Sequence, residues 1–478
     1  MAEYVGWVDR CAAALRVPRA RWILVGSILG SGAVFVEGSV TTVALPAIAA
    51  DFHLGIAGLQ WVMNGYLLTL SALILLGGAL GDRFSRRRVF AIGLGGFAVA
   101  SLGCAFAPNG TLLVVARVVQ GMAGALVVPN SLALLETAFS GESRGAAIGR
   151  WAAWSAVSTA LGPLVGGWLV SAASWRLVFI CVAPFAIAAV VAVNIGATAC
   201  DDPGRKSARV DYLGAASVTL GLAGLVGALI AGPDFGFGHP WVLAIGVGGL
   251  VMLIAFLLIE RRVRYPLLPL GVFRSRQFSG VNGTTLVVYA AINTVFLFLM
   301  LQLQTVMHYN PIAAGASLLP INALMLAFSP LAGRVAERSG PRLPMVIGCL
   351  VAGAGSLLFM RVRPGASYVA TVLPAATTFG VGLACFVAPL TSVALGALDQ
   401  DLAGLASGVN NAVARLAGLL ATAIIPLAIG LGGVRELRGH ELAAGFPRAA
   451  IICAALCVVG AAIAALTIGD RTRPGDAT

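Results

Sequence analysis

The chain has 478 residues, of which 59% are hydrophobic and 10% are charged, and its net charge is +12. This composition excludes an ordinary soluble domain, in which about 25% of residues are charged. It also excludes a basic nucleic-acid-binding domain, because no segment between the apolar runs is long enough to fold into one.

Apolar runs of about 20 residues recur along the whole chain, and a run of that length crosses a bilayer as a helix. We predict about fourteen such spans. The first eight lie near residues 22–46, 58–78, 89–107, 111–135, 146–170, 177–198, 212–231 and 241–259. The other six lie near residues 278–301, 313–333, 345–360, 368–390, 402–431 and 448–468. The predicted fold class is therefore an all-α integral membrane protein.

Most of the 31 Lys and Arg residues fall in the N-terminal segment, in alternate loops and in the C-terminal tail. This asymmetry matches the positive-inside rule. It predicts a multi-pass protein of the cytoplasmic (inner) cell membrane with both termini in the cytoplasm.

The first span contains Glu37, the only acid that we place deep inside a span. The fourth span contains Arg117, well inside its apolar run. A charge in hydrocarbon is costly, so each should face a polar cavity or a partner. A buried carboxyl can hold a proton and release it when it becomes hydrated. We therefore predict that Glu37 and Arg117 take part in proton coupling. The alternatives are a structural acid beside a polar neighbour and an arginine that snorkels.

A charged turn follows the second span, and a similar turn occurs later in the chain, at residues 78–88 and 333–342. Both begin with Gly, have an acid four residues later (Asp82 and Glu337), and continue with Arg. We expect Asp82 to hold the nearby arginines and to latch the cytoplasmic helix ends. The alternative is a positive-inside loop that happens to contain an acid. The expected gate residues are Gly78, Asp82, Arg83, Arg86, Arg87, Gly333, Glu337 and Arg338.

The fifth span contains Gly162, Pro163, Gly166 and Gly167. Small residues at this spacing allow another helix to approach closely, and Pro163 removes a backbone hydrogen bond and bends the helix. The alternative is a tight helix pair with no directional role.

Polar and aromatic side chains within the predicted spans are candidates for lining a substrate cavity, although most single residues of this kind are expected to hold helices together. The candidates are Asn64, Tyr66, Trp154, Asn282, Tyr289, Asn293, Asn322, Phe386, Asn411 and Arg415.

Four of these segments resemble motifs of the major facilitator superfamily. Residues 78–88 resemble its loop pattern G-x-L-a-D-r-x-G-r-k/r, and residues 117–125 its fourth-helix pattern R-x-x-Q-G-x-g-a-A, whose Arg is linked to proton transfer. Residues 162–167 resemble the G-P-x-x-G-G part of a pattern that marks exporters. Residues 37–46 resemble D-x-T-x-V-N-V-A-L-P of the fourteen-span drug–proton antiporters, with Glu37 in the place of the Asp.

The resemblance implies a major facilitator fold, and the repeated turn suggests a duplicated architecture. We expect a six-helix half at residues 1–199, two inserted helices with their loops at 200–276, and a second six-helix half at 277–478. The implied function is proton-coupled export of a hydrophobic small molecule, a drug or antibiotic, by alternating access. The partners would be that substrate, protons and the lipid bilayer, without nucleic acid.

We expect no cofactor, no metal and no enzymatic activity, because no phosphate loop, metal cluster or nucleophile arrangement is present in the sequence. The composition, rich in Ala, Gly and Arg, suggests a bacterial source. Two alternatives remain at this point, namely a proton-coupled importer on the same fold and a membrane sensor that does not transport.

Overall fold

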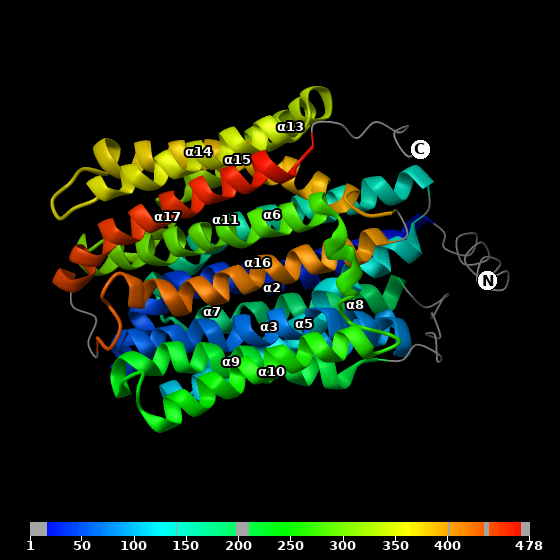
Figure 1. Cartoon of the computed structure of the whole chain (residues 1–478), viewed down its shortest axis with the longest axis horizontal. Coiled ribbons are helices and arrows are strands. Elements are labelled where there is room, and N and C mark those ends of the chain that lie inside the picture. Colours follow the sequence, from blue (N-terminus) through cyan, green and yellow to red (C-terminus); the bar gives the residue numbers. More distant parts are fainter. Residues whose placement is uncertain (1–16, 140, 197–209, 400–401, 435–438, 470–478) are drawn as a thin grey trace. The chain divides into compact units, whose positions relative to one another are not determined.

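The computed structural model describes residues 17–139, 141–196, 210–399, 402–434 and 439–469. Within these residues, fourteen helices are long and apolar enough to cross a membrane, which confirms the predicted number and the all-helical class. Figure 1 shows helices that follow one another in the chain, such as Tyr212–Phe235 and Pro240–Arg262, running side by side along their lengths.

The first eight spans are separated by short turns, by residue 140 and by residues 197–209, the last two of which are not described. Their helices are α2 (Val17–Phe52), α3 (Ile56–Phe84), α4 (Arg86–Ala105), α5 (Gly110–Ala138), α6 (Gly141–Ala172), the pair α7 (Arg176–Ile180) and α8 (Val182–Gly196), α9 (Tyr212–Phe235) and α10 (Pro240–Arg262).

The last six spans follow a short 3₁₀ turn, η1 (Leu270–Arg274). Their helices are α11 (Arg276–Leu301) with η2 (Gln302–Val306), α12 (Pro311–Ala316) with α13 (Leu319–Ser339), α14 (Arg342–Leu358) with η3 (Phe359–Arg361), η4 (Tyr368–Val372) with α15 (Leu373–Gly396), α16 (Ala403–Ala428) and α17 (Gly439–Thr467).

Short polar side chains begin several of these helices by accepting hydrogen bonds from free backbone N–H groups. The Asn109 side chain accepts from the N–H of Leu112 at 2.9 Å, and that of Asn310 accepts from Ala313 at 2.7 Å. The first span is longer than the predicted residues 22–46, because α2 continues through Pro46 to Phe52. In lipid a helix that stopped there would expose several unbonded backbone groups, whereas Pro46 removes one hydrogen bond.

The two charged turns are shorter than the sequence predicted. Helix α3 includes Asp82 and ends at Phe84, and α13 includes Glu337 and ends at Ser339. The break in the first turn is the single residue Ser85, with a φ of 146°. The break in the second is Gly340, with a φ of 90°, and Pro341 follows it. The acids therefore lie on the last turns of helices.

The chain forms two compact units. One holds the described residues of Met1–Phe52, Trp61–Ala228 and Leu243–Leu268, and the other holds those of His53–Gln60, Leu229–Val242 and Pro269–Thr478. The division therefore passes through α3, α9 and α10. The boundary that we predicted near residue 200 falls in residues 197–209, outside the described part of the chain.

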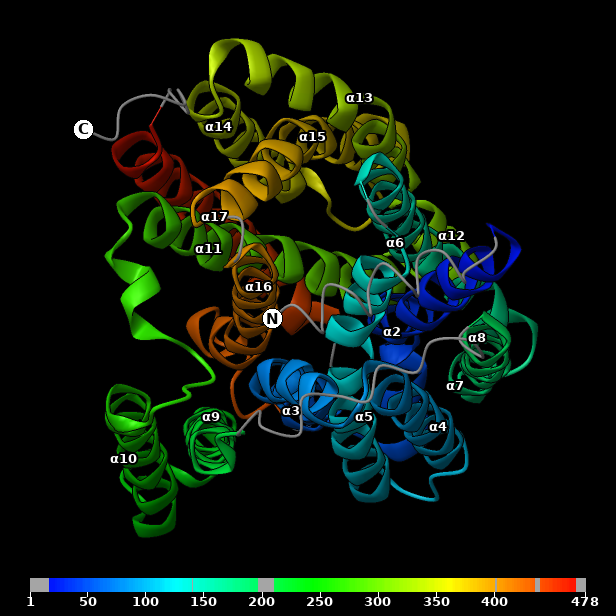
Figure 2. The ribbon, with the colours of Figure 1, turned by 90° about the vertical axis from the view of Figure 1, so that its right-hand side faces the viewer.

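The same helix pairings occur inside both units. In the first, α2 packs against α5, α6 and α8, and α4 packs against α5 and α8. In the second, α11 packs against α15, α16 and α17, and α14 packs against α15 and α17. By order of spans these pairings correspond one to one, and Figure 2 shows each set end-on. The repeat therefore extends from the charged turns to the packing of whole helices.

Helices α9 and α10 form a closely packed pair beside the first set (Figure 2). A Cβ placed on Gly224 would lie 2.8 Å from the Cα of Gly249, so the two backbones touch at this point. A Cβ on Gly227 would lie 3.7 Å from the Trp61 ring, which places α9 against α3.

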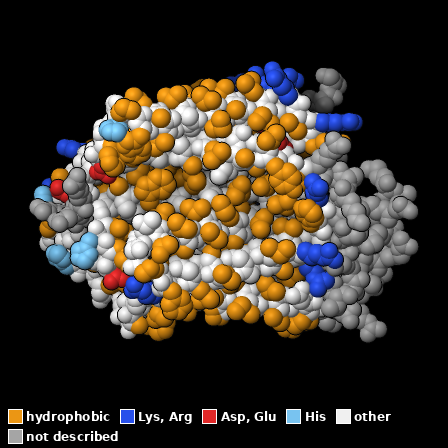
Figure 3. All heavy atoms as spheres, turned by 90° about the horizontal axis from the view of Figure 1, so that it is seen from below, with side chains coloured by type: hydrophobic (Ala, Val, Ile, Leu, Met, Phe, Trp, Pro, Cys, Tyr) orange, Lys and Arg blue, Asp and Glu red, His pale blue; other side chains and the backbone are white. Residues whose placement is uncertain are grey.

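Apolar side chains cover the outer surface. On the face drawn in Figure 3 they are spread over the middle, and charged and His side chains gather toward its ends. Large side chains such as Val99, Leu213 and Leu466 are 71%, 72% and 70% exposed. Such a surface suits lipid and would be unstable in water.

Candidate functional site

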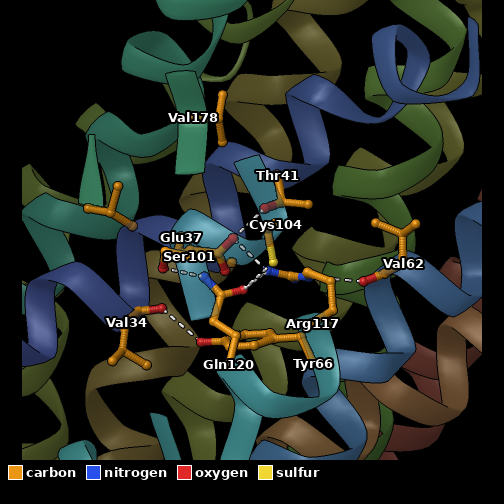
Figure 4. Close-up of polar contacts among 12 residues, drawn as sticks. Val34, Glu37, Thr41, Val62, Tyr66, Ser101, Cys104, Arg117, Gln120 and Val178 are labelled. Carbon is orange, nitrogen blue, oxygen red and sulfur yellow. Dashed lines mark hydrogen bonds and ion pairs between the residues drawn. The ribbon is translucent and has the colours of Figure 1, made fainter. Parts of the chain in front are cut away.

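The acid and the arginine that the sequence predicted for proton coupling meet each other. Glu37 on α2 and Arg117 on α5 are both fully buried, and Arg117 Nη1 lies 2.5 Å from Glu37 Oε1. Thr41, one helical turn after Glu37, donates its hydroxyl hydrogen to the same carboxylate oxygen at 2.8 Å. Figure 4 shows these side chains converging from neighbouring helices.

Further polar groups surround the guanidinium of Arg117. Its Nε donates to the backbone carbonyl of Val62 at 3.0 Å, and its Nη1 also donates to Gln120 Oε1 at 2.7 Å. Gln120 in turn donates to Ser101 Oγ on α4 at 2.8 Å. Four helices, α2, α3, α4 and α5, therefore supply one connected polar network within the first unit.

The Tyr66 ring stacks on this network. The guanidinium carbon of Arg117 lies 4.4 Å from the ring centroid, a cation–π distance, and Tyr66 donates its hydroxyl hydrogen to the Val34 carbonyl at 3.1 Å. Tyr66 is 1% exposed. This candidate for the substrate cavity therefore packs against the buried charges.

The network leaves specific atoms open. Among the residues that the structure describes, Glu37 Oε2 and Arg117 Nη2 are buried and have no hydrogen-bond partner. Buried polar atoms are almost always paired, so such atoms are rare in a folded protein. Glu37 Oε2 is an acceptor that can take up a proton without first breaking another hydrogen bond.

The first charged turn is held by an ion pair. Arg86 Nη2 lies 2.9 Å from Asp82 Oδ1, and Arg86 Nη1 donates to the Ala133 carbonyl on α5 at 3.1 Å. Arg87 Nε donates to Asn194 Oδ1 on α8 at 3.2 Å, and Arg83 lies over the Phe84 ring. Asp82 thus binds Arg86, while Arg83 and Arg87 make these other contacts. The turn connects the ends of α3, α4, α5 and α8.

The second turn is built differently. Glu337 and Arg338 are exposed, and Glu337 has no ion-pair partner among the described residues. Gly333 has open space where a Cβ would stand, whereas a Cβ on Gly78 would touch Pro129 at 3.6 Å. Within the described part of the chain, the second turn keeps the sequence pattern of the first without its ion pair.

The glycines of the fifth span face α2. A Cβ on Gly162 would collide with Ser39, and one on Gly166 would lie 2.8 Å from Val40 Cγ1. Pro163 and Gly167 are buried beside them on α6. The close approach that the small-residue pattern predicted therefore exists, and its partner is the helix that carries Glu37.

The remaining cavity candidates of the first unit have different surroundings. Asn64 on α3 is fully buried, and neither its side-chain oxygen nor its nitrogen has a hydrogen-bond partner among the described residues. Trp154 on α6 is 56% exposed, so most of its ring lies on the surface.

In the second unit, several candidates follow one seam between α11 and α16. Asn410 donates to Asn282 Oδ1 at 3.2 Å and to Thr285 Oγ1 at 2.8 Å. One turn apart on α11, Asn293 donates to the Tyr289 carbonyl at 2.7 Å. Arg415 lies close enough to Tyr289 to act on it electrostatically.

Three candidates lie away from the hydrogen bonds of this seam. Asn411 donates to the Ser407 carbonyl of its own helix at 3.4 Å. Asn322 is half-buried on α13, and Phe386 is fully buried on α15.

Sequence reasoning missed several members of these sites. Thr41 and Gln120 lie four and three residues after the two charges, on the same helix faces, so their spacing was a usable signal. Ser101 and the Val62 carbonyl carry no such signal, because tertiary packing brings them in. Asn130, which donates to the Gly77 carbonyl at 2.9 Å beside the first turn, was also missed.

The model of the Major Facilitator Superfamily matches residues 27–210 and 203–422 of the chain. The chain is 34% identical over 85% of its length to the puromycin resistance protein pur8 of Streptomyces alboniger, and it covers 81% of that protein. It is 34% identical over 84% of its length to the tetracenomycin C resistance and export protein of Streptomyces glaucescens, covering 74% of it. With the drug efflux pump JefA of Mycobacterium tuberculosis it shares 32% identity over 85% of its length and 80% of that protein.

Solved structures show the same fold. A crystal structure of the peptide transporter POT in complex with sulfate matches 97% of this chain and 99% of its own, with a TM-score of 0.69 and 14% identity. A bacterial homologue of the lysosomal transporter Spinster matches 96% and 100%, with a TM-score of 0.66 and 17% identity. These relatives are transporters and not enzymes. The chain belongs to the major facilitator superfamily and is related to its fourteen-span drug-resistance and efflux proteins.

Proposed function

We propose that the protein is a proton-coupled exporter, an antiporter that expels a hydrophobic drug or antibiotic across the cytoplasmic membrane by alternating access. The resistance and export functions named for its relatives support export of a small molecule. The observation that carries the proton coupling is the fully buried pair Glu37–Arg117 with its open Glu37 Oε2.

A proton on Glu37 would change the forces that hold the first unit together. The ionised carboxylate attracts Arg117 and thereby ties α2 to α5, whereas the neutral acid leaves the arginine without its counter-charge. Buried ion pairs are strongly destabilised when one charge is removed, so the helices would rearrange rather than tolerate the change. Each proton that enters the cell also brings electrical work of about 2.3 kcal/mol per 100 mV.

We also propose roles for the glycine motif of α6 and for the two charged turns. Gly162, Pro163, Gly166 and Gly167 bring α6 onto the helix that carries Glu37, so a change at Glu37 would pass to this contact. The turn at Asp82 would latch the cytoplasmic ends of its helices, together with its weaker counterpart at Glu337. Within each unit, the polar residues described above would face the substrate during part of the cycle.

We also propose the six-two-six layout, with halves at residues 1–199 and 277–478, the inserted segment at 200–276, and both termini in the cytoplasm. The positive-inside distribution of Lys and Arg supports this orientation, and the equivalent helix pairings of the two units support the duplication. Tags at Met1 and Thr478 should resist external protease in intact cells, and cleavage of one tag alone would exclude the layout.

The test of coupling is Glu37→Gln in inverted membrane vesicles. The amide cannot gain and lose a proton as a carboxyl group does. Substrate-driven proton release and substrate uptake against a gradient should therefore fall to background, while membrane insertion is kept. Glu37→Asp should retain part of the activity, because it keeps an acid one methylene shorter. Glu136→Gln, which changes an acid 27% exposed at the end of α5, is the matched control and should transport normally.

Other outcomes separate the alternatives. Full pH-dependent antiport by Glu37→Gln would place the proton site elsewhere, whereas inward accumulation of substrate in intact cells would indicate an importer. A wild-type protein that moves neither protons nor any compound from a chemically varied panel would be a sensor rather than a transporter.

A further inference from the structure

A pair of buried acids lies in the first unit, far along the chain from Glu37. Asp211 directly precedes α9, and Glu260 lies in the last turn of α10. Asp211 is 7% exposed and Glu260 is 4% exposed, although both lie at helix ends, where acids are usually solvated.

One oxygen of each carboxylate is bound to the backbone. Asp211 Oδ1 accepts the N–H of Gly214 at 2.8 Å and so caps the first turn of α9. Glu260 Oε2 accepts the N–H of Leu268 at 3.0 Å and so ties the end of α10 to the segment that follows it. Both acids are therefore held in fixed positions.

The second oxygen of each carboxylate has no hydrogen-bond partner among the described residues. Asp211 Oδ2 and Glu260 Oε1 are both buried without a hydrogen bond among the described residues. A Cβ placed on Gly214 would lie 2.5 Å from Asp211 Oδ2 and 2.9 Å from Glu260 Oε1. Both oxygens thus converge on one point, which is open only because residue 214 is a glycine.

Among the described residues, the charged groups around this point do not neutralise it. Arg261, Arg262 and Arg264 follow Glu260 but are exposed, and neither acid forms an ion pair among the described residues. Helix α3, which packs against α9, has Asp82 and Arg83 as its charged residues, and Asp82 already pairs with Arg86. Asp211 is itself the charged group whose field reaches Glu260. Two like charges in this position would repel each other.

We propose that Asp211 and Glu260 form a proton-binding site, in which one carboxyl group is protonated and donates a hydrogen bond to the other carboxylate. The shared proton removes the repulsion, satisfies both open oxygens, and joins the first turn of α9 to the last turn of α10. Pairs of acids that are held close together bind one proton in this way.

A metal ion fits the site less well than a proton. Calcium takes six to eight oxygen ligands and magnesium prefers an octahedron, whereas two carboxylate oxygens converge here and the Cα of Gly214 stands beside them. Among the described residues, no group of three or more acidic, His or Cys side chains could hold a metal. A proton needs only the two oxygens.

The site makes the stability of the α9–α10 pair depend on pH with a definite sign. In the unfolded chain the two carboxyl groups are separate and lose their protons near pH 4. The folded pair keeps one proton to higher pH, so the folded state binds more protons than the unfolded state in that range. Its stability therefore falls as the pH rises through the titration of the pair.

The experiment is thermal unfolding of the purified full-length protein in lipid nanodiscs between about pH 5 and pH 9. The wild-type midpoint should fall by about 2 °C or more as the pH rises. Asp211→Asn keeps the helix cap, and its amide can donate to Glu260 without a proton. Its midpoint should therefore lose this pH dependence and exceed that of the wild type at high pH.

Two further variants make the result specific. Glu260→Gln should behave like Asp211→Asn, and in both variants the infrared band of a protonated carboxyl should decrease. Asp234→Asn changes an exposed acid at the other end of α9, so it should keep the wild-type pH dependence. Unchanged pH dependence in both amide variants would overturn the proposal. Stabilisation of the wild type by calcium or magnesium that is lost in Asp211→Asn would instead identify a metal site and overturn it as well.

Discussion

In the first unit, α2 and α5 meet through the buried ion pair of Glu37 and Arg117, whereas their counterparts in the second unit, α11 and α15, contain no acid and no base beyond Arg276 at the start of α11. The helix pairings are nevertheless the same in both units. The scaffold therefore does not need the charges, because the second unit packs the equivalent helices without them.

The two units also differ in the contacts that hold their first and fifth helices together. In the first, Gly162 and Gly166 let α6 touch α2 directly. In the second, Asn410 on α16 hydrogen-bonds to Asn282 and Thr285 on α11. Backbone contact through glycine gives a tight and apolar joint, while the amide seam presents groups that can exchange partners.

The largest effect on stability should come from separating the buried charges. Arg117→Gln leaves Glu37 buried without a counter-charge, so it should cost about 3–5 kcal/mol in the free energy of unfolding. The double variant Glu37→Gln with Arg117→Gln restores a neutral pair that can hydrogen-bond, and should recover most of that loss. Thermal unfolding of the single and double variants in nanodiscs provides the complete cycle.

The second unit supplies the comparison for this cycle. Asn282→Ala removes one hydrogen-bond acceptor from the seam with Asn410 and should cost about 1 kcal/mol. If the double variant were as unstable as Arg117→Gln alone, the loss would come from packing around the arginine and not from its charge. The two units would then differ in how their helices pack and not in how charges hold the helices together.

An intermediate effect is expected at the glycine joint. Gly162→Ala places a methyl group against Ser39 and the Val36 carbonyl, so α6 must move away from α2 at a cost of about 1–3 kcal/mol. Gly149→Ala on the same helix enters open space and should be neutral or slightly stabilising. Equal unfolding midpoints for these two variants would contradict the close approach.

The fourteen spans could be predicted from sequence because lipid requires long apolar runs, and no other feature of the chain produces them. That Glu37 and Arg117 would each have a polar partner could be predicted for the same reason, since an unpaired charge in such a run is costly. Helix ends were less predictable. Pro46 and Gly333 looked like ends, yet α2 and α13 continue through both, because a helix in lipid keeps its backbone bonded until a residue such as Ser85 or Gly340 turns the chain.

The partners of these residues were not predictable in the same way. The Val62 carbonyl and Ser101 come to Arg117 through tertiary packing, which leaves no periodic signal in the sequence. Asp211 and Glu260 escaped notice because acids near span ends are common and usually solvated. Their burial follows from Gly214 and from the return of the chain at Leu268, and neither is visible without the fold.

The smallest effect on stability, with a large effect on transport, should come from the charged turns. Asp82 is 53% exposed, and exposed ion pairs contribute about 0–1 kcal/mol, so Asp82→Asn should hardly change the unfolding midpoint. It should nevertheless reduce transport strongly in vesicles, because Arg86 would lose the acid that orients it between α3 and α5. Glu337→Gln should have a milder effect, because Glu337 has no ion-pair partner among the described residues. Wild-type transport by the Asp82 variant would leave the turn as a basic loop that only fixes topology, and equal losses in the two variants would mean that the second turn acquires an ion pair in another state of the cycle.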